Sequence, residues 1–166
     1  MSTNSNNQET AMSTETTITR EVVIQGVLEL ILDNEEVNKG ADAYASKTVP
    51  NPDRDHCSCD EEDTYYMLYS LYIQKVIITA CTRTWMHTDW GVCDYIDDAL
   101  LEHVLNVVEE HDDLTLWCHG EAEGNADADR LAPEGSIEHT HYWAIYEEEW
   151  LSILLTVASR VTRPVA

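Results

Sequence analysis

Residues 64–85, TYYMLYSLYIQKVIITACTRTW, decide the fold, because their apolar residues fit either a helix or a strand. The residues that would share one face of a helix are Leu68, Tyr69, Tyr72, Ile73 and Val76. Those that would share one face of a strand are Met67, Tyr69, Leu71, Ile73 and Ile77. Tyr, Ile, Val and Thr dominate the segment, and these residue types are enriched in strands. The composition therefore predicts one long strand, or two strands in sequence.

Two amphipathic helices are predicted on either side of this segment. The first begins at Thr19, a plausible N-cap, and is followed by apolar residues at helical spacing until the polar stretch DNEEVNKG (33–40). The second follows Asp94, with Asp97 and Asp98 in its first turn, where the helix dipole favours negative charge. Its predicted buried stripe consists of Ile96, Leu100, Val104, Val107 and Val108.

The rest of the chain has the residue pattern of strands and loops. A short strand and a long loop are predicted within 41–63, a strand at 114–123 and an exposed loop at 124–136. Two further strands are predicted at 137–146 and 151–161, joined by a bend at Glu147, Glu148 and Glu149. No internal repeat is visible. The predicted fold is α+β, with two helices packed on a mainly antiparallel β-sheet.

The predicted domain organisation is one compact domain with a disordered arm at the N-terminus. The arm covers residues 1–17, which are polar and acidic and offer little to bury, and the single α+β domain covers residues 18–166. The arm has neither the basic nor the apolar region of a secretory signal.

Charge is the most unusual property of the sequence. The chain has 32 acidic and 9 basic residues, a formal net charge of −23 and no Phe. Repulsion on such a surface extends about 10 Å at 0.1 M salt and about 3 Å at 1 M. The composition therefore indicates a protein of a salt-accumulating halophile or of its virus; the alternative is an acidic mesophilic protein.

The same composition argues against several classes of protein. No cluster of Lys or Arg is present to neutralise phosphates, so sequence-specific binding of nucleic acid is not expected. The longest apolar runs are far shorter than the roughly 20 residues of a membrane-spanning helix. The five cysteines are an odd number at irregular spacing, which favours assembly in a reducing, intracellular compartment.

Histidines and cysteines suggest a metal site only weakly. The candidate ligands are His56, Cys57, Cys59, His139 and His141, with Cys118 or Cys81 as a further thiol. His139 and His141 would share one face of a strand, but no second Cys pair at zinc-finger spacing answers Cys57 and Cys59. Ordinary buried thiols and surface imidazoles are the favoured interpretation, so no metal and no cofactor are predicted.

Nothing in the sequence indicates an enzyme. Adjacent carboxylates such as Asp97 and Asp98 are expected by chance in a chain with 32 acidic residues. Neither a nucleophile elbow nor a Gly-rich phosphate loop is present. Trp85 and Trp90 bracket the loop before the second helix and are the predicted protein-contact residues, because a loop Trp has few core neighbours.

The order of these elements resembles that of tail terminator (tail completion) proteins of tailed phages and archaeal tailed viruses. The resemblance runs from REVVIQGVLELILDN (20–34) through LYSLYIQKVIITACTRT (68–84) to HYWAIYEEEWLSILLTVASRV (141–161). It implies a structural virion protein without catalytic residues, assembled in the host cytoplasm. It further implies a homo-oligomer, a hexameric ring, that caps the tail tube beneath the head–tail connector.

Two other functions remain open at this point. One is a haloarchaeal cytoplasmic protein-binding or regulatory module, and the other is a small metal-binding protein. Mass in solution at high salt distinguishes a ring from a module, and elemental analysis tests the metal.

Overall fold

The computed structural model describes residues 17–50, 59–85 and 96–162, and within these ranges every regular element is an α-helix. The predicted α+β fold is therefore wrong, since none of the described residues forms a strand. The helices are α2 (Arg20–Leu32), α3 (Glu35–Ser46), α4 (Cys59–Trp85), α5 (Asp98–Glu109), α6 (Asp112–Glu123) and α7 (Ile137–Arg160). Of the predicted arm, only Thr17 belongs to the described residues.

The segment that decides the fold belongs to α4, a single helix of 27 residues. Its fully or nearly buried apolar residues recur at helical spacing: Tyr65, Tyr72, Ile73, Val76, Ile77, Ala80 and Cys81. The preference of Tyr, Ile and Val for strands is weak and depends on context, so packing against neighbouring helices overrides it. The strand prediction relied on composition where the helical spacing was the better signal.

The three predicted strands in the second half of the chain are also wrong. Residues 114–123 belong to α6, and 137–160 form the single helix α7, so Glu147, Glu148 and Glu149 lie within a continuous helix instead of at a bend. Ser136 begins α7 by accepting a hydrogen bond from the His139 N–H. The short strand predicted after residue 41 is likewise the second half of α3.

The two predicted helices are confirmed, and both begin at acceptor side chains. The Thr19 hydroxyl accepts the N–H of Val22 at 3.2 Å, which caps α2. The Asp97 carboxylate accepts the N–H of Ala99 at 2.9 Å, which caps α5. Each contact satisfies a donor that the first turn of a helix leaves unpaired. Asp94, the cap predicted for the second helix, lies outside the described residues.

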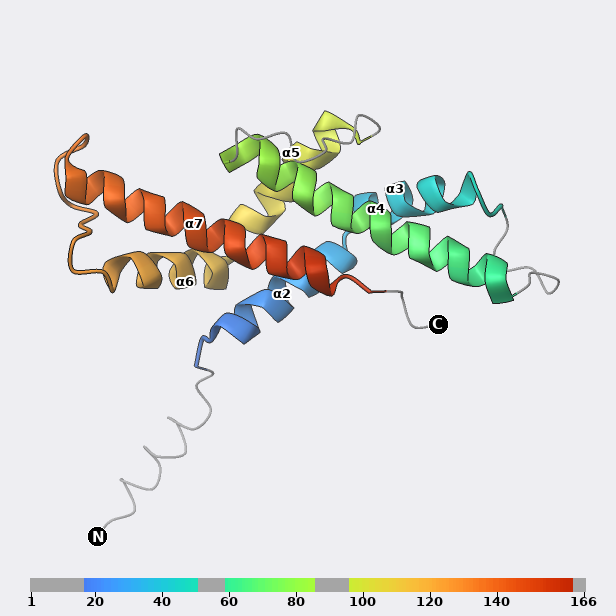
Figure 1. Cartoon of the computed structure of the whole chain (residues 1–166), viewed down its shortest axis with the longest axis horizontal. Helices are drawn as coiled ribbons and strands as arrows, with labels where there is room; N and C mark the ends of the chain where they lie inside the picture. Colours follow the sequence, from blue (N-terminus) through green and yellow to red (C-terminus); the bar gives the residue numbers. More distant parts are fainter. Residues whose placement is uncertain (1–16, 51–58, 86–95, 163–166) are drawn as a thin grey trace, which may run out of the picture.

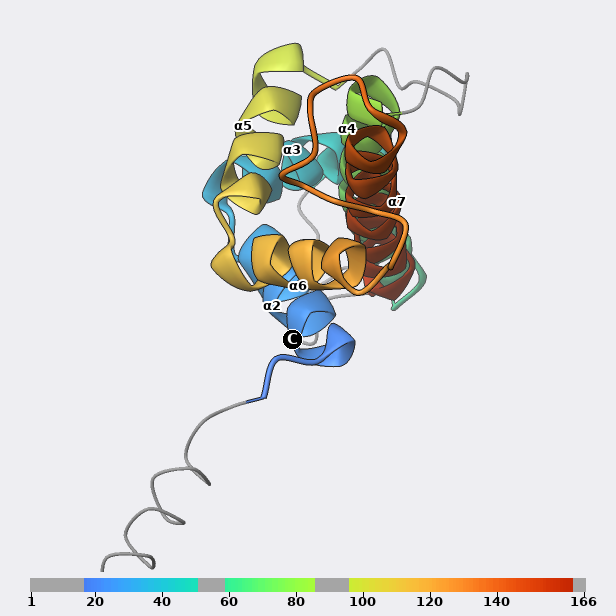
Figure 2. The same ribbon diagram turned by 90° about the vertical axis from the view of Figure 1, so that its left-hand side faces the viewer.

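The long helices α4 and α7 run antiparallel to each other across the middle of the molecule, as the colours in Figure 1 show. Of the shorter helices, α3 packs on the N-terminal part of α4, and α6 packs on the N-terminal part of α7. Figure 2 shows α4 and α7 along one side of the molecule and α5 on the other. The main core draws on all six described helices, and Trp150 is the largest of its fully buried side chains.

Two helix-interior glycines, Gly40 in α3 and Gly120 in α6, give a matched test of this packing. A Cβ at Gly40 would lie 2.6 Å from the Tyr72 hydroxyl oxygen, whereas a Cβ at Gly120 meets nothing within 4 Å. Gly120→Ala is expected to raise the free energy of unfolding by about 0.5–1 kcal/mol through helix propensity. Gly40→Ala is expected to lower it, because overpacking costs about 1–3 kcal/mol. Denaturant titration measures both, and equal stabilisation by the two variants would contradict the close approach of α3 to Tyr72.

Candidate functional site

Several residues predicted to be functional fall outside what the structure describes. His56, Cys57 and Trp90 lie between the described ranges. Cys59 and Trp85 are the first and last residues of α4, but their side chains are outside the described part. The predicted contact pair, Trp85 and Trp90, therefore stays a prediction.

His139 and His141 do not share a face, because they lie on a helix instead of a strand. Two residues on, an α-helix has turned by about 200°. His139 Nε2 accepts the indole N–H of Trp143 at 3.2 Å, while His141 Nδ1 lies 3.4 Å from the backbone oxygen of Asp127. Across the three described ranges, no group of three or more His, Cys, Asp or Glu is placed to hold a metal ion.

The two described cysteines, Cys81 and Cys118, are buried free thiols. Burial raises the pKa of both to about 12, and Glu149 and Glu121 add to the shift at Cys118. Since the thiolate is the nucleophile and the metal ligand, neither residue is suited to either role in this state. Both pack as small apolar residues of the main core.

Among the adjacent glutamates Glu147, Glu148 and Glu149 of α7, Glu149 has the most defined environment. Its Oε1 accepts from the Trp117 indole at 2.9 Å and from Arg20 Nε at 3.3 Å. Arg20 also donates to the Ser152 hydroxyl at 2.9 Å. Glu149 thus ties α2, α6 and α7 together, which is a structural role. Burial raises the pKa of neighbouring Glu147.

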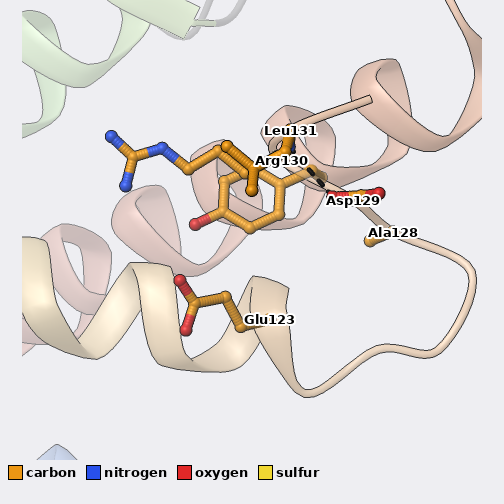
Figure 3. A pocket seen from close by; sticks show the side chains of 6 residues that line it. Glu123, Ala128, Asp129, Arg130 and Leu131 are labelled. Carbon is orange, nitrogen blue, oxygen red and sulfur yellow. Dashed lines mark hydrogen bonds between the residues drawn. The ribbon is translucent and has the colours of Figure 1, made fainter. Parts of the chain in front are cut away.

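The most distinctive surface feature is the α6–α7 tip, defined as residues 124–136 with the adjoining ends of α6 and α7. A depression of about 490 Å³ lies here. Figure 3 shows the Arg130 side chain above the depression and Glu123 below it. The lining residues are Glu123, Ala128, Asp129, Arg130, Leu131 and Tyr142.

The loop of the tip is held in place by its own hydrogen bonds. The Asp129 N–H donates to the backbone oxygen of Glu138 at 3.0 Å, and the Asp129 carboxylate accepts the Leu131 N–H at 2.9 Å. Gly135 adopts a φ of 88°, a conformation that side-chain-bearing residues rarely take, just before the Ser136 cap. The loop therefore has a defined shape although most of its side chains are exposed.

An aromatic cluster of His119, Tyr142, Trp143 and Tyr146 lies beneath the tip. Tyr142 is fully buried, and its hydroxyl group hydrogen-bonds to His119 Nδ1. The ring of His119 lies 4.7 Å from that of Tyr146, and the rings of Trp143 and Tyr142 are 5.4 Å apart, edge to face. Such contacts stabilise pairs of rings beyond the area they bury. The cluster joins α6 to α7, and its Tyr146 also packs against the main core.

His119 is held in its neutral form. Burial lowers its pKa, the positive charge of Arg130 lowers it further, and Glu123 opposes them. When the neutral imidazole of His119 carries its proton on Nε2, its Nδ1 accepts a hydrogen bond from the Tyr142 hydroxyl group. Burial and the charge of Glu123 raise the pKa of Tyr142, so the pair stays uncharged near neutral pH. His119 and Tyr142 therefore have a structural role, because their hydrogen bond joins α6 to α7 beneath the tip.

Two large aliphatic side chains point into solvent at the tip. Leu131 is 91% exposed and Ile137 is 82% exposed. Both stand among charged residues, namely Glu123, Asp127, Asp129, Arg130, Glu134 and Glu138. Single exposed apolar residues are common, but two at one ordered loop beside a depression are typical of a contact surface. The sequence could have indicated this contact surface, because Leu131 and Ile137 are the only large aliphatic residues in the stretch GNADADRLAPEGSI (124–137).

Comparison with known proteins identifies no relative: no protein-family model, curated protein or solved structure matches the chain. None of the helices in the described ranges is long and apolar enough to cross a membrane.

Proposed function

We propose that this protein is a protein-binding module that docks on its partner through the α6–α7 tip. The observation that carries the proposal is the exposure of Leu131, on a loop of defined shape, and of Ile137, the first residue of α7 after that loop. An exposed aliphatic side chain that becomes buried contributes about 1.5–3 kcal/mol. Because hydrogen bonds already order the loop, little conformational entropy is lost when a partner binds.

The charges of the tip select the partner. Several acidic residues lie close to the two aliphatic residues in the sequence, and Glu123, Asp129 and Arg130 line the depression together with Leu131. A complementary surface therefore carries an apolar side chain flanked by Lys or Arg. If the protein works in molar salt, these charges are screened within about 3 Å, and the apolar contacts supply most of the affinity. Salts excluded from the protein surface strengthen apolar contacts further.

The tail-terminator role has lost the observation that supported it. The resemblance depended on strands at 64–85, 114–123 and 137–161, and these residues are helical. A docking module of a haloarchaeal cytoplasm, which the sequence also allowed, requires no sheet. The two proposals differ in mass at 2–3 M KCl, where a six-fold ring supports the virion role and a monomer or dimer supports the module.

Leu131→Asp and Ile137→Asp are expected to abolish docking without unfolding the protein. The ligands are peptides that carry Leu or Ile between Lys or Arg residues, and calorimetry at 2–3 M KCl measures binding. Leu116→Asp is the matched control, because Leu116 is 57% exposed but lies on α6 outside the lining of the tip depression. We expect at least a tenfold loss of affinity for each tip variant and none for the control. Binding of no such peptide, or equal losses in all three variants, would refute the docking proposal.

A further inference from the structure

We infer that the chain consists of two copies of one three-helix unit. The two units pack on each other as the two subunits of a homodimer do. The first unit is α2–α3–α4 and the second is α5–α6–α7. The face that α4 and α7 present to each other is then a dimerisation surface, and the partner it fits is a second copy of the same unit. The amino-acid sequence shows no visible repeat, so the inference depends on the arrangement and burial of the helices.

The two units match in helix length and connection. The helices have 13, 12 and 27 residues in the first unit and 12, 12 and 24 in the second. Two residues separate the first pair of helices in each unit, and the second of them caps the next helix. Asn34 accepts the N–H of Val37 at 3.1 Å, and His111 accepts that of Leu114 at 3.3 Å.

Every buried position of α5, α6 and α7 corresponds to a buried position of the first unit at one constant spacing of 77 residues. The buried residues of α3 are Val37, Ala41 and Ala45, and those of α6 are Leu114, Cys118 and Ala122. The same spacing relates the buried positions Ile24, Val27 and Ile31 of α2 to Leu101, Val104 and Val108 of α5. It also relates Tyr65, Ile73, Val76, Ile77, Ala80 and Cys81 of α4 to Tyr142, Trp150, Ile153, Leu154, Val157 and Ala158 of α7.

This correspondence is sensitive to register. A shift of one residue turns a helix by about 100° and would place different side chains in the core. All three pairs of helices nevertheless keep the same spacing, although the connections between them could have differed in length. Any three amphipathic helices could bury one face each, but independent helices have no reason to keep one register throughout.

Polar contacts inside the units follow the same spacing. Tyr65 donates its hydroxyl proton to Asp42, and the corresponding Tyr142 bonds to His119. In both units a tyrosine of the long helix meets a polar residue of the second helix. The contacts one turn further along are Tyr69 with Asn38 and Tyr146 with Thr115.

Contacts between the units are reciprocal, which is the signature of an isologous, two-fold interface. The Asn34 amide lies 3.2 Å from His103 Nε2, and thus joins the first unit to α5. The corresponding pair is His111 and Gly26, where a side chain on Gly26 would lie 3.0 Å from His111 Nε2. In an isologous pair, residue i contacts j while j contacts i, as these four positions do.

The starts of α2 and α5 show the same reciprocity. Arg20 at the start of α2 pairs with Glu149 of α7 at 3.3 Å. The corresponding residues are Asp97 and Tyr72, and the charge of Asp97 contributes to the raised pKa of Tyr72 after burial, the larger cause. The antiparallel crossing of α4 and α7 in Figure 1 agrees with such an axis.

Where the two units differ in sequence, a change in side-chain size at one position is compensated at the position that it contacts. The Trp117 indole of α6 donates a hydrogen bond to Glu149 of α7. The corresponding residue of α3 is Gly40, which lies against the larger side chain of Tyr72. The bulky ring is thus on the short helix in one unit and on the long helix in the other. Compensation of this kind preserves the helix packing while the two copies change in sequence.

Full-length chains with damage in one unit test the inference. Ala41→Glu places a charge in the fully buried face of α3, and Cys118→Glu does so at the corresponding position of α6. Each variant alone is expected to lose helical circular dichroism in 2–3 M KCl. In an equimolar mixture refolded from denaturant, the intact second unit of one chain pairs with the intact first unit of the other. We expect the helical signal to recover and light scattering to show the mass of two chains.

The control is a mixture of Ala41→Glu with Ala45→Glu, which damages the first unit in both chains. It provides no intact first unit, so it is not expected to recover the signal of the complementary mixture. A complementary mixture whose spectrum equals the average of its components at every concentration would overturn it.

Discussion

Replacing Trp150 by alanine is expected to lower the free energy of unfolding by about 3–5 kcal/mol. Trp150 of α7 is 2% exposed and lies in the main core. Removing it takes away the largest fully buried side chain and leaves a cavity that well-packed helices fill only in part. Because single domains are stable by only about 5–15 kcal/mol, this loss is a large fraction of the total.

Denaturant titration in high salt, followed by circular dichroism, measures the change. Trp143→Ala is the matched control, since Trp143 is half-buried in the aromatic cluster and does not belong to the main core. The control is expected to lose clearly less stability than Trp150→Ala. Equal losses would contradict the placement of Trp150 in the main core and of Trp143 outside it.

Transfer from 3 M to 0.1 M KCl is expected to unfold much of the protein or to lower its melting temperature strongly. The formal net charge is −23, and repulsion that is screened beyond about 3 Å at 1 M salt extends about 10 Å at 0.1 M. Among the described residues, ion pairs relieve little of this charge: Arg20 pairs with Glu149, Arg160 with Glu21, and Lys39 with Glu35 and Glu36. The Lys39 pairs are exposed and contribute little.

Thermal unfolding at several salt concentrations measures this dependence. A sucrose series at 0.1 M KCl is the control, because sucrose favours the compact state without screening charge. We expect KCl to raise the melting temperature more than sucrose does when the two are excluded from the protein surface to the same extent. An unchanged melting temperature between 0.1 and 3 M KCl would contradict adaptation to a saline environment.

Where helices were predicted correctly, the local signals agreed with each other. In α2 and α5, a capping side chain, an acidic first turn and an apolar stripe all coincide. The cap predicted at Thr19 is the observed one, and Asp97, placed in the first turn, proves to be the cap of α5. The loop at 124–136 was also predicted, but its exposed Leu131 and Ile137 were not recognised as a site.

Where strands were predicted, composition and alternation were misleading for an identifiable reason. In 151–161, one face of a strand would carry Ile153 and Leu155, whereas the helix buries Ile153 and Leu154. Helices packed on more than one side bury a wide face, so their apolar residues come close together and resemble a buried strand. Residues 64–85 and 114–123 were mistaken for strands through their apolar, β-favouring composition.

The amino-acid sequence by itself determined the acidic character of the protein, the position of its first helix and that of α5. These properties depend on side chains close together in the chain: caps, first turns and one narrow apolar stripe. Only the tertiary structure decided that α4, α6 and α7 are helices, because their burial comes from partners far away in the sequence. It also revealed the 77-residue correspondence, since a core position requires a size and an apolar character but not one amino acid. Cys118 can therefore occupy the place of Ala41, and Trp150 that of Ile73, without leaving a visible repeat.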